Sequence, residues 1–219
     1  MPDLVIFGTG DIARLAHFYF GRDTDLRVVA FTVDASHRDA GELLGLPLVD
    51  FESVERRFPP SSFGLFVALG YTRMNRLRAE RYERAKEKGY SLASYVSPRC
   101  TWLAESSPGD NCFILEDATV QPFVRVGNDV TLWSGTHIGH DAVIEDHCFL
   151  APRVAVSGRV RIGPFCFVGI NATLRNAITV APGTLIGAGA LIMKDTEENG
   201  VYVPRRTDPI SRKSFDVKI

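Results

Sequence analysis

The chain has 219 residues, of which 45% are hydrophobic and 23% charged, a composition typical of globular proteins with one or two domains. A net charge of −1 provides no field that would draw the chain to nucleic acid or to a membrane surface, so we expect neither partner. The opening MPDLVIFGTGD lacks the basic flank of a signal peptide, and no apolar run is long enough to span a bilayer. We therefore expect a cytoplasmic protein.

Residues 1–92 are predicted to form a small α/β domain. Apolar runs indicate buried strands at Leu4–Phe7, Arg27–Val33 and Phe63–Leu69, with helices expected from Asp11 to about Phe20 and from Arg73 to Lys88. Strands that alternate with helices are typical of a parallel sheet with crossover helices. The second helix interleaves basic with acidic residues, which predicts a solvated face.

The loop after the first strand has a glycine pattern that suits a phosphate. Gly8, Gly10 and Ala13 match G-x-G-x-x-A, which lets backbone N–H groups at a helix N-terminus approach a phosphate. Asp34 ends the second strand, where its carboxylate could accept hydrogen bonds from a base or ribose or could serve only as a turn residue. A dinucleotide-dependent enzyme would show the same loop, but this domain is half the usual size. We predict a substrate-binding site at Gly8, Gly10 and Asp34.

Residues 93–195 contain a six-residue repeat. Fourteen aliphatic residues follow one another at this interval: Ile114, Val120, Val126, Leu132, Ile138, Ile144, Leu150, Val156, Ile162, Val168, Leu174, Val180, Ile186 and Ile192. A small or apolar residue stands two positions before each one. Such a period is the signature of a parallel β-helix whose short strands surround a narrow apolar core. Three hexads make one triangular coil, so residues 18 apart should stack at about 4.8 Å.

The four cysteines are expected to be free thiols. Cys112, Cys148 and Cys166 occupy the small-residue position of the repeat, and Cys100 lies on its backward extension. Free cysteines behave as small buried hydrophobes, so we predict no disulfides. Residues 196–219 lie outside the repeat and are expected to form a cap or to pack against a neighbour.

The flat flanks of a β-helix predict a homotrimer. Trp133, Phe149 and Phe167 are expected to point outward and to need cover. Three prisms around a threefold axis would form a closed ring with one repeated interface.

The order of a small α/β domain and a hexapeptide region resembles the sugar acyltransferases of the NeuD/PglD type. Three stretches carry the resemblance: FGTGDIA (Phe7–Ala13), Gly139-His140-Asp141, and FVGIN (Phe167–Asn171) followed by TLIGAGALIMKD (Thr184–Asp195). The resemblance implies a nucleotide-sugar-binding α/β domain, a left-handed β-helix, and an acyl-CoA such as acetyl-CoA as co-substrate. Many members have a second histidine where this chain has Phe149.

The resemblance also implies roles for individual residues. His140 would be the general base for acyl transfer and Asp141 the carboxylate that orients it, whereas spacing alone favours a surface pair. Stacking of residues 18 apart places Gly158 and Lys194 above His140, and Ile170 and Ala188 above Pro152. We expect the acyl-CoA to bind along these four residues, with Lys194 facing one of its phosphates. No metal is expected.

Four functions remain open at this stage. The leading one is an acyl-CoA-dependent N-acyltransferase that acts on the amino group of a nucleotide-linked sugar, and sugar O-acylation is a close alternative. A zinc lyase of the carbonic anhydrase type would need three histidines gathered across a subunit interface, such as His137, His140 and His147. Otherwise we expect His137 and His147 at the surface or in an interface. The fourth is a non-catalytic nucleotide-sugar sensor.

Overall fold

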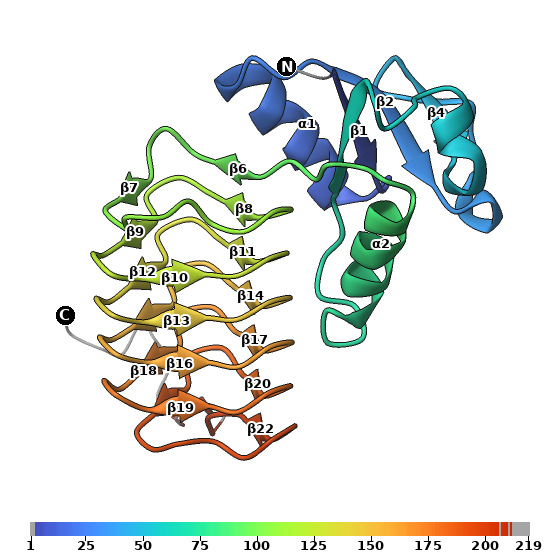
Figure 1. Ribbon diagram of the computed structural model, residues 1–219. Helices are drawn as coiled ribbons and strands as arrows, with labels where there is room; N and C mark the ends of the chain where they lie inside the picture. Colours follow the sequence, from blue (N-terminus) through green and yellow to red (C-terminus); the bar gives the residue numbers. More distant parts are fainter. Residues whose placement is uncertain (1–2, 206, 210, 212–219) are drawn as a thin grey trace.

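A computed structural model describes residues 3–205, 207–209 and 211 (Figure 1). The first part is a sheet in the order β3-β4-β2-β1-β5. The strands are β1 (Asp3–Phe7), β2 (Val28–Val33), β3 (Glu42–Leu43), β4 (Leu46–Asp50) and β5 (Phe63–Val67), all parallel except β3. The three predicted strands are confirmed. The predictions missed β3 and β4, since both are short and only Leu48 of β4 is buried.

Two α-helices cover this sheet, α1 (Asp11–Asp23) and α2 (Arg76–Glu87), with short 3-10 helices η1 (Ala35–His37) and η2 (Phe51–Arg56). Helix α2 begins three residues later than predicted. Arg73, Met74 and Asn75 all have left-handed backbone conformations, with φ of 54°, 53° and 65°, and such residues cannot extend a right-handed helix.

The second part is the predicted hexapeptide β-helix, built from three parallel sheets that we name after a central strand. The β13 sheet contains β10 (Arg125–Val126), β13 (Val143–Ile144), β16 (Arg161–Ile162) and β19 (Thr179–Val180). The β14 sheet contains β6 (Tyr95–Val96), β8 (Phe113–Ile114), β11 (Thr131–Leu132), β14 (Phe149–Leu150), β17 (Phe167–Val168), β20 (Leu185–Ile186) and β22 (Val201–Tyr202). The β12 sheet contains β7 (Thr101–Trp102), β9 (Thr119–Val120), β12 (His137–Ile138), β15 (Ala155–Val156), β18 (Thr173–Leu174) and β21 (Leu191–Ile192).

The repeat places the core where it was predicted. All fourteen aliphatic positions are buried, and so are the small residues two positions before them. Residues 18 apart pair directly, as His137 does with Ala155 and Thr131 with Phe149. The cysteines are free, as predicted, and burial raises the pKa of Cys112 to about 12, so its reactive thiolate is scarce at neutral pH.

The corners of the coils follow a second six-residue period that was not predicted. Every sixth residue has a positive φ: Asn111, Asp117, Phe123, Asp129, Gly135, Asp141, His147, Arg153, Arg159, Phe165, Asn171, Ala177, Gly183 and Gly189. Gly, Asn and Asp adopt this conformation at least cost, which accounts for most of the column. The two phenylalanines in it are unusual.

The α/β domain packs on the β14 sheet of the same chain (Figure 1). The ring of Tyr71 lies 5.0 Å from that of Phe149 and 4.6 Å from that of Phe167, and Trp133 packs against the core that α1 shares with the sheet. Phe149 is therefore only 3% exposed. The chain's own α/β domain thus covers Phe149, so the expectation that this ring needs a second copy is wrong, whereas Trp133 and Phe167 stay partly exposed.

A buried ion pair joins the two parts. Arg78 on α2 is 2% exposed, and its Nε donates to Oδ1 of Asp129, which is fully buried, at 2.9 Å. The remaining N–H groups of Arg78 reach Gly70, Asn75 and the carbonyls of Asp129 and Cys148. The predicted solvated face of this helix is therefore wrong at Arg78.

His147 belongs to the same buried cluster. Its Nδ1 lies 2.9 Å from Oδ2 of Asp129, and Phe165 stacks on its ring at 4.9 Å. His147 is 8% exposed, so the surface position expected for it within the chain is wrong.

The predicted cap, residues 196–219, contains β22, which pairs with β20 and extends the β14 sheet. Residues 206, 210 and 212–219 of this cap lie outside the described residues. The domain boundaries at 92/93 and 195/196 stay a prediction. In the described part of the chain, no helix combines the length and apolar character needed to cross a membrane.

Candidate active site

His140 lies at the corner between β12 and β13. Its side chain is 52% exposed, and its Nδ1 lies 2.7 Å from Oδ2 of Asp141. A carboxylate accepts hydrogen bonds, so Nδ1 carries the proton in the neutral ring and Nε2 keeps its lone pair. The corner thus presents a solvent-accessible nitrogen base with an oriented ring.

The backbone of this corner is held by neighbouring coils. A Cβ on Gly139 would come within 2.5 Å of the Gly158 nitrogen, so glycine is required there. The His140 N–H donates to Oε1 of Gln121 at 2.8 Å, and the His140 carbonyl accepts from Arg159 at 2.8 Å. Gln121 is a positioning residue that sequence reasoning missed, although its place one coil below the corner could have indicated it.

Gly158 lies against the imidazole of His140. A Cβ on Gly158 would meet Nε2 at 2.6 Å, Cε1 at 2.8 Å and Cδ2 at 3.0 Å. The nearest neighbour of Gly158 is therefore the His140 ring itself. The role of Gly158 in acyl-CoA binding stays a prediction. So does the role of Lys194, an exposed residue three coils from His140, or about 14 Å along the same column of corners.

Ile170 lies at a different corner, between β17 and β18. Ala188 lies at the equivalent corner one coil further on, between β20 and β21. Pro152 stands 12 residues after His140, which is two thirds of a coil, so the column of Pro152, Ile170 and Ala188 cannot coincide with that of His140. One chain alone does not bring Ile170 and Ala188 to His140.

These two residues line an apolar cavity of about 350 Å³ together with Tyr71, Trp133, Phe149, Ala151, Pro152, Phe167 and Gly169. Nε1 of Trp133 is buried without a hydrogen-bond partner among the described residues.

The residues predicted to bind a nucleotide meet in one pocket of about 270 Å³. Gly8 has φ +123°, and a Cβ there would lie 2.8 Å from the Ala68 carbonyl oxygen, so both conformation and space require glycine. Gly10 is the N-cap of α1 and supplies no side-chain cap, which leaves the first N–H groups of the helix available.

Asp34 is held at the edge of this pocket by Arg81, which sequence reasoning missed. The guanidinium of Arg81 donates twice to Oδ2 of Asp34, at 2.9 and 2.7 Å. Oδ1 of Asp34 is buried and has no hydrogen-bond partner among the described residues. Oδ1 also lies 3.9 Å from the Arg84 guanidinium, so the carboxylate faces two cations at the edge of the pocket.

The three histidines of the zinc alternative do not meet within the chain. His137 is exposed on β12, His140 is at the next corner, and His147 is buried against Asp129 at the corner after that. No group of three or more His, Cys, Asp or Glu side chains in the described residues could hold a metal ion. A histidine metal site would therefore need residues from more than one copy.

Residues 123–158 match the protein family described as bacterial transferase hexapeptide (six repeats). A UDP-3-O-acylglucosamine N-acyltransferase of Herminiimonas arsenicoxydans is 30% identical over 88 residues, which are 40% of this chain and 23% of that protein. An acyl-[acyl-carrier-protein]–UDP-N-acetylglucosamine O-acyltransferase of Helicobacter pylori (strain Shi470) is 29% identical over 70 residues, 32% of this chain and 26% of that protein. The chain thus spans about a quarter of the length of these curated relatives.

Two solved structures share the arrangement of both parts. The acetyltransferase domain of PglB from Neisseria gonorrhoeae FA1090 superimposes with a TM-score of 0.79 at 24% identity, covering 92% of this chain and 96% of that one. A variant of perosamine N-acetyltransferase from Caulobacter crescentus, solved with CoA and GDP-perosamine, gives 0.80 at 24% identity, covering 92% and 93%. The predicted fold, an α/β domain followed by a hexapeptide β-helix, is confirmed, and so is the resemblance at the level of fold.

Proposed function

We propose that this hexapeptide-repeat protein is an acyl-CoA-dependent N-acyltransferase that acylates the amino group of a nucleotide-linked amino sugar, with acetyl-CoA as the simplest donor. The observation that carries the proposal is the half-exposed His140, whose Nδ1 is held by Asp141 and whose Nε2 is free. The similar perosamine N-acetyltransferase was solved with CoA and GDP-perosamine as a variant in which asparagine replaces a histidine, which supports a histidine in this role.

The chemistry follows from the state of His140. The sugar amine attacks the thioester carbonyl carbon while Nε2 takes a proton from the nitrogen, so that a C–N bond forms without a charged ammonium. The carboxylate of Asp141 stabilises the imidazolium that results. The C–S bond then breaks, and the leaving sulfur takes the proton back from Nε2, which yields an amide and free CoA.

The pocket of the α/β domain is suited to the nucleotide. The uncapped N-terminus of α1, after Gly8 and Gly10, offers N–H groups to a phosphate. The carboxylate of Asp34, which lines the same pocket, offers an acceptor to a ribose hydroxyl or a base N–H. These features support the assignment of the nucleotide to this domain and leave the β-helix to the acyl donor.

The donor site is the part that a single chain leaves incomplete. Gly158 and Lys194 lie on the corner column of His140, whereas Ile170 and Ala188 lie on another column, in an apolar cavity suited to a pantetheine arm. A homotrimer would place the His140 corner of one copy beside the Ile170 corner of the next. Trimer formation is thus part of this proposal, as is a cytoplasmic location, where acyl-CoA is made and used.

The test is turnover by the purified chain. Acetyl-CoA and a panel of amino-sugar nucleotides are incubated with the protein, and products are identified by mass spectrometry. We expect a singly acetylated product from at least one amino sugar and none from the matched sugar nucleotide with a hydroxyl in place of the amine. Acetylation of the hydroxyl analogue alone would make the protein an O-acyltransferase. Stoichiometric zinc in the purified protein with no acyl transfer would instead favour a lyase.

A further inference from the structure

A cavity of about 460 Å³ lies between helix α2 and the corner of the β-helix that joins the β13 and β14 sheets. We name it the α2 pocket. Ala79, Glu83 and Glu87 of the helix line one wall, and His147 and Phe165 of the corner line the other. The cavity shares no lining residue with the nucleotide pocket, and the proposed mechanism does not use it.

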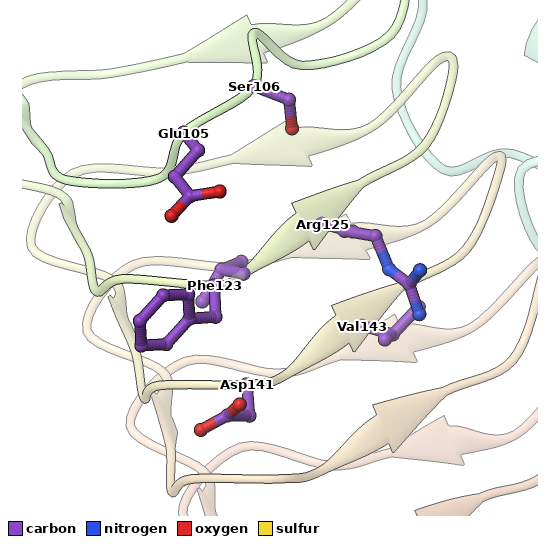
Figure 2. A pocket seen from close by; sticks show the side chains of 7 residues that line it. Glu105, Ser106, Phe123, Arg125, Asp141 and Val143 are labelled. Carbon is purple, nitrogen blue, oxygen red and sulfur yellow. The ribbon is translucent and has the colours of Figure 1, made fainter.

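The corner beside this cavity is the one that the proposed trimer leaves free. A coil is triangular, and its other two corners carry His140 and Ile170, which the trimer places beside neighbouring copies. The hollow lined by Glu105, Phe123 and Asp141 lies at the His140 corner, so a neighbouring copy can cover it (Figure 2). The α2 pocket lies at the third corner, which points away from the threefold axis, and both of its walls belong to one chain. A neighbouring copy therefore does not account for it.

Two free carboxylates lie on the helix wall. Glu83 and Glu87 are exposed, and the four residues between them correspond to about 6 Å along the helix axis. The ion pairs that α2 forms in the described part of the chain leave both of them out, since they involve Arg78, Glu80, Arg81, Arg84 and Lys86. Both negative charges are thus available to a ligand.

The guanidinium groups at the pocket are already engaged within the chain. That of Arg84 lies 3.9 Å from Oδ1 of Asp34 and 5.5 Å from the ring centre of Phe51. That of Arg76 lies over the ring of Phe165, 4.8 Å from its centre. The unbalanced charge of the pocket is therefore negative, which favours a cationic ligand.

His147 adds a neutral acceptor to the opposite wall. The residue is 8% exposed, and its Nδ1 lies 2.9 Å from Oδ2 of Asp129, so Nδ1 carries the proton in the neutral ring and Nε2 keeps its lone pair. No described residue donates a hydrogen bond to Nε2. The ring of Phe165, stacked on the imidazole at 4.9 Å, gives this wall an apolar surface as well.

We propose that the α2 pocket binds a short aliphatic diamine. Its two ammonium groups bind Glu83 and Glu87, and an N–H of one of them donates to Nε2 of His147. The methylene chain between them lies on Ala79 and Phe165, as an alkyl chain between two charged ends requires. A metal ion fits less well, because no three His, Cys, Asp or Glu side chains of the described residues lie together as metal ligands. The site is independent of the proposed acyl transfer.

Calorimetric titration of the whole protein with putrescine, a four-carbon diamine, tests the proposal at physiological salt. We expect one site per chain and a Kd about 10-fold higher or more in Glu83→Gln/Glu87→Gln. Both side chains are exposed, so this double variant should keep the wild-type melting temperature. Glu42→Gln/Glu198→Gln is the matched control, because it removes two exposed carboxylates outside the pocket, and it should bind as the wild type does.

Butylamine, the monoamine of the same length, should bind about 10-fold more weakly than putrescine, since it reaches only one carboxylate. The absence of putrescine binding by the wild type would overturn the proposal, as would equal binding by the Glu83→Gln/Glu87→Gln variant or equal binding of butylamine. Binding of inorganic phosphate in place of putrescine would make the pocket an anion site at Arg76 and Arg84. His147→Asn is a poorer probe, because it also removes the contact with Asp129 in the buried cluster.

Discussion

Gly158 is in contact with the reactive edge of His140, since a methyl group on its α-carbon would reach within 2.6 Å of Nε2. Substitution at Gly158 therefore acts first on the base. Gly158→Ala should tilt the imidazole away from its productive position and lower kcat by about 100-fold, the usual effect of a displacement near 1 Å.

The same substitution should leave the protein folded. Gly158 does not have a positive φ, and the three nearest neighbours of the added methyl are atoms of a half-exposed ring that can turn away. Melting temperature and the KM for acetyl-CoA measure the two effects separately. A raised KM at normal kcat would show that the methyl group obstructs the donor and spares the base.

His140→Asn should lower kcat by about 100-fold or more, because general-base catalysis is lost while the binding sites stay intact. Asp141→Asn should lower kcat through the loss of the hydrogen bond that orients Nδ1, with smaller effects on either KM. His137→Asn is the control, since His137 is exposed on the neighbouring strand. Normal turnover in His140→Asn would place the base elsewhere.

Asp34→Asn should weaken binding of the nucleotide sugar about 10-fold and leave acetyl-CoA binding unchanged, because one charged acceptor of the pocket is lost. Gly10→Val should act in the same direction: nothing lies within 4 Å of the added Cβ, so the side chain enters open space at the mouth of the helix. Gly8→Ala is a poorer probe, since it would disturb the fold at Ala68.

Calorimetry with each ligand separately measures these effects. Loss of acetyl-CoA binding in Asp34→Asn, with nucleotide binding retained, would mean that the α/β domain holds the donor.

The β-helix could be predicted residue by residue because every coil repeats one environment. Ile138 and Val156 occupy equivalent positions one coil apart, and a polar residue at either would be buried without a partner. The meeting of Gly10 with Asp34 was predictable for a similar reason, since adjacent parallel strands end at the same edge.

Other features depend on contacts between distant segments. Arg78 is one of several arginines on a charged helix, and nothing local distinguishes it as the one that meets Asp129, 51 residues away. The separation of Ile170 from His140, by contrast, could be predicted from the sequence, because the 18-residue coil places the two residues on different columns. Phe123 was also within reach of sequence analysis, since it interrupts a corner column otherwise rich in Asn, Asp and Gly.

Arg78→Met should destabilise the protein by about 3–5 kcal/mol, because Asp129 would stay buried without its main counter-charge. Chemical denaturation measures the loss, and Arg84→Met, at a half-exposed position, should change stability by less than about 1 kcal/mol. The double variant Arg78→Met/Asp129→Leu should lose less than the sum of the single changes. Additive losses would show that the two side chains contribute independently.

The last prediction tests whether the active site is shared between copies. His140→Asn removes the base, and Ile170→Glu places a charge in the apolar cavity at the other corner, so each variant alone should be nearly inactive. If His140 of one copy works with Ile170 of the next, trimers mixed from the two variants regain sites in which both residues are intact. Random mixing at equal amounts gives an intact pair at about a quarter of the interfaces of a cyclic trimer. Co-expressed variants should therefore recover about a quarter of wild-type kcat, and light scattering should report a trimer for each variant. A site contained within one chain would give no recovery in the mixture, because every chain carries one of the two defects. A monomer by light scattering would remove the shared site altogether.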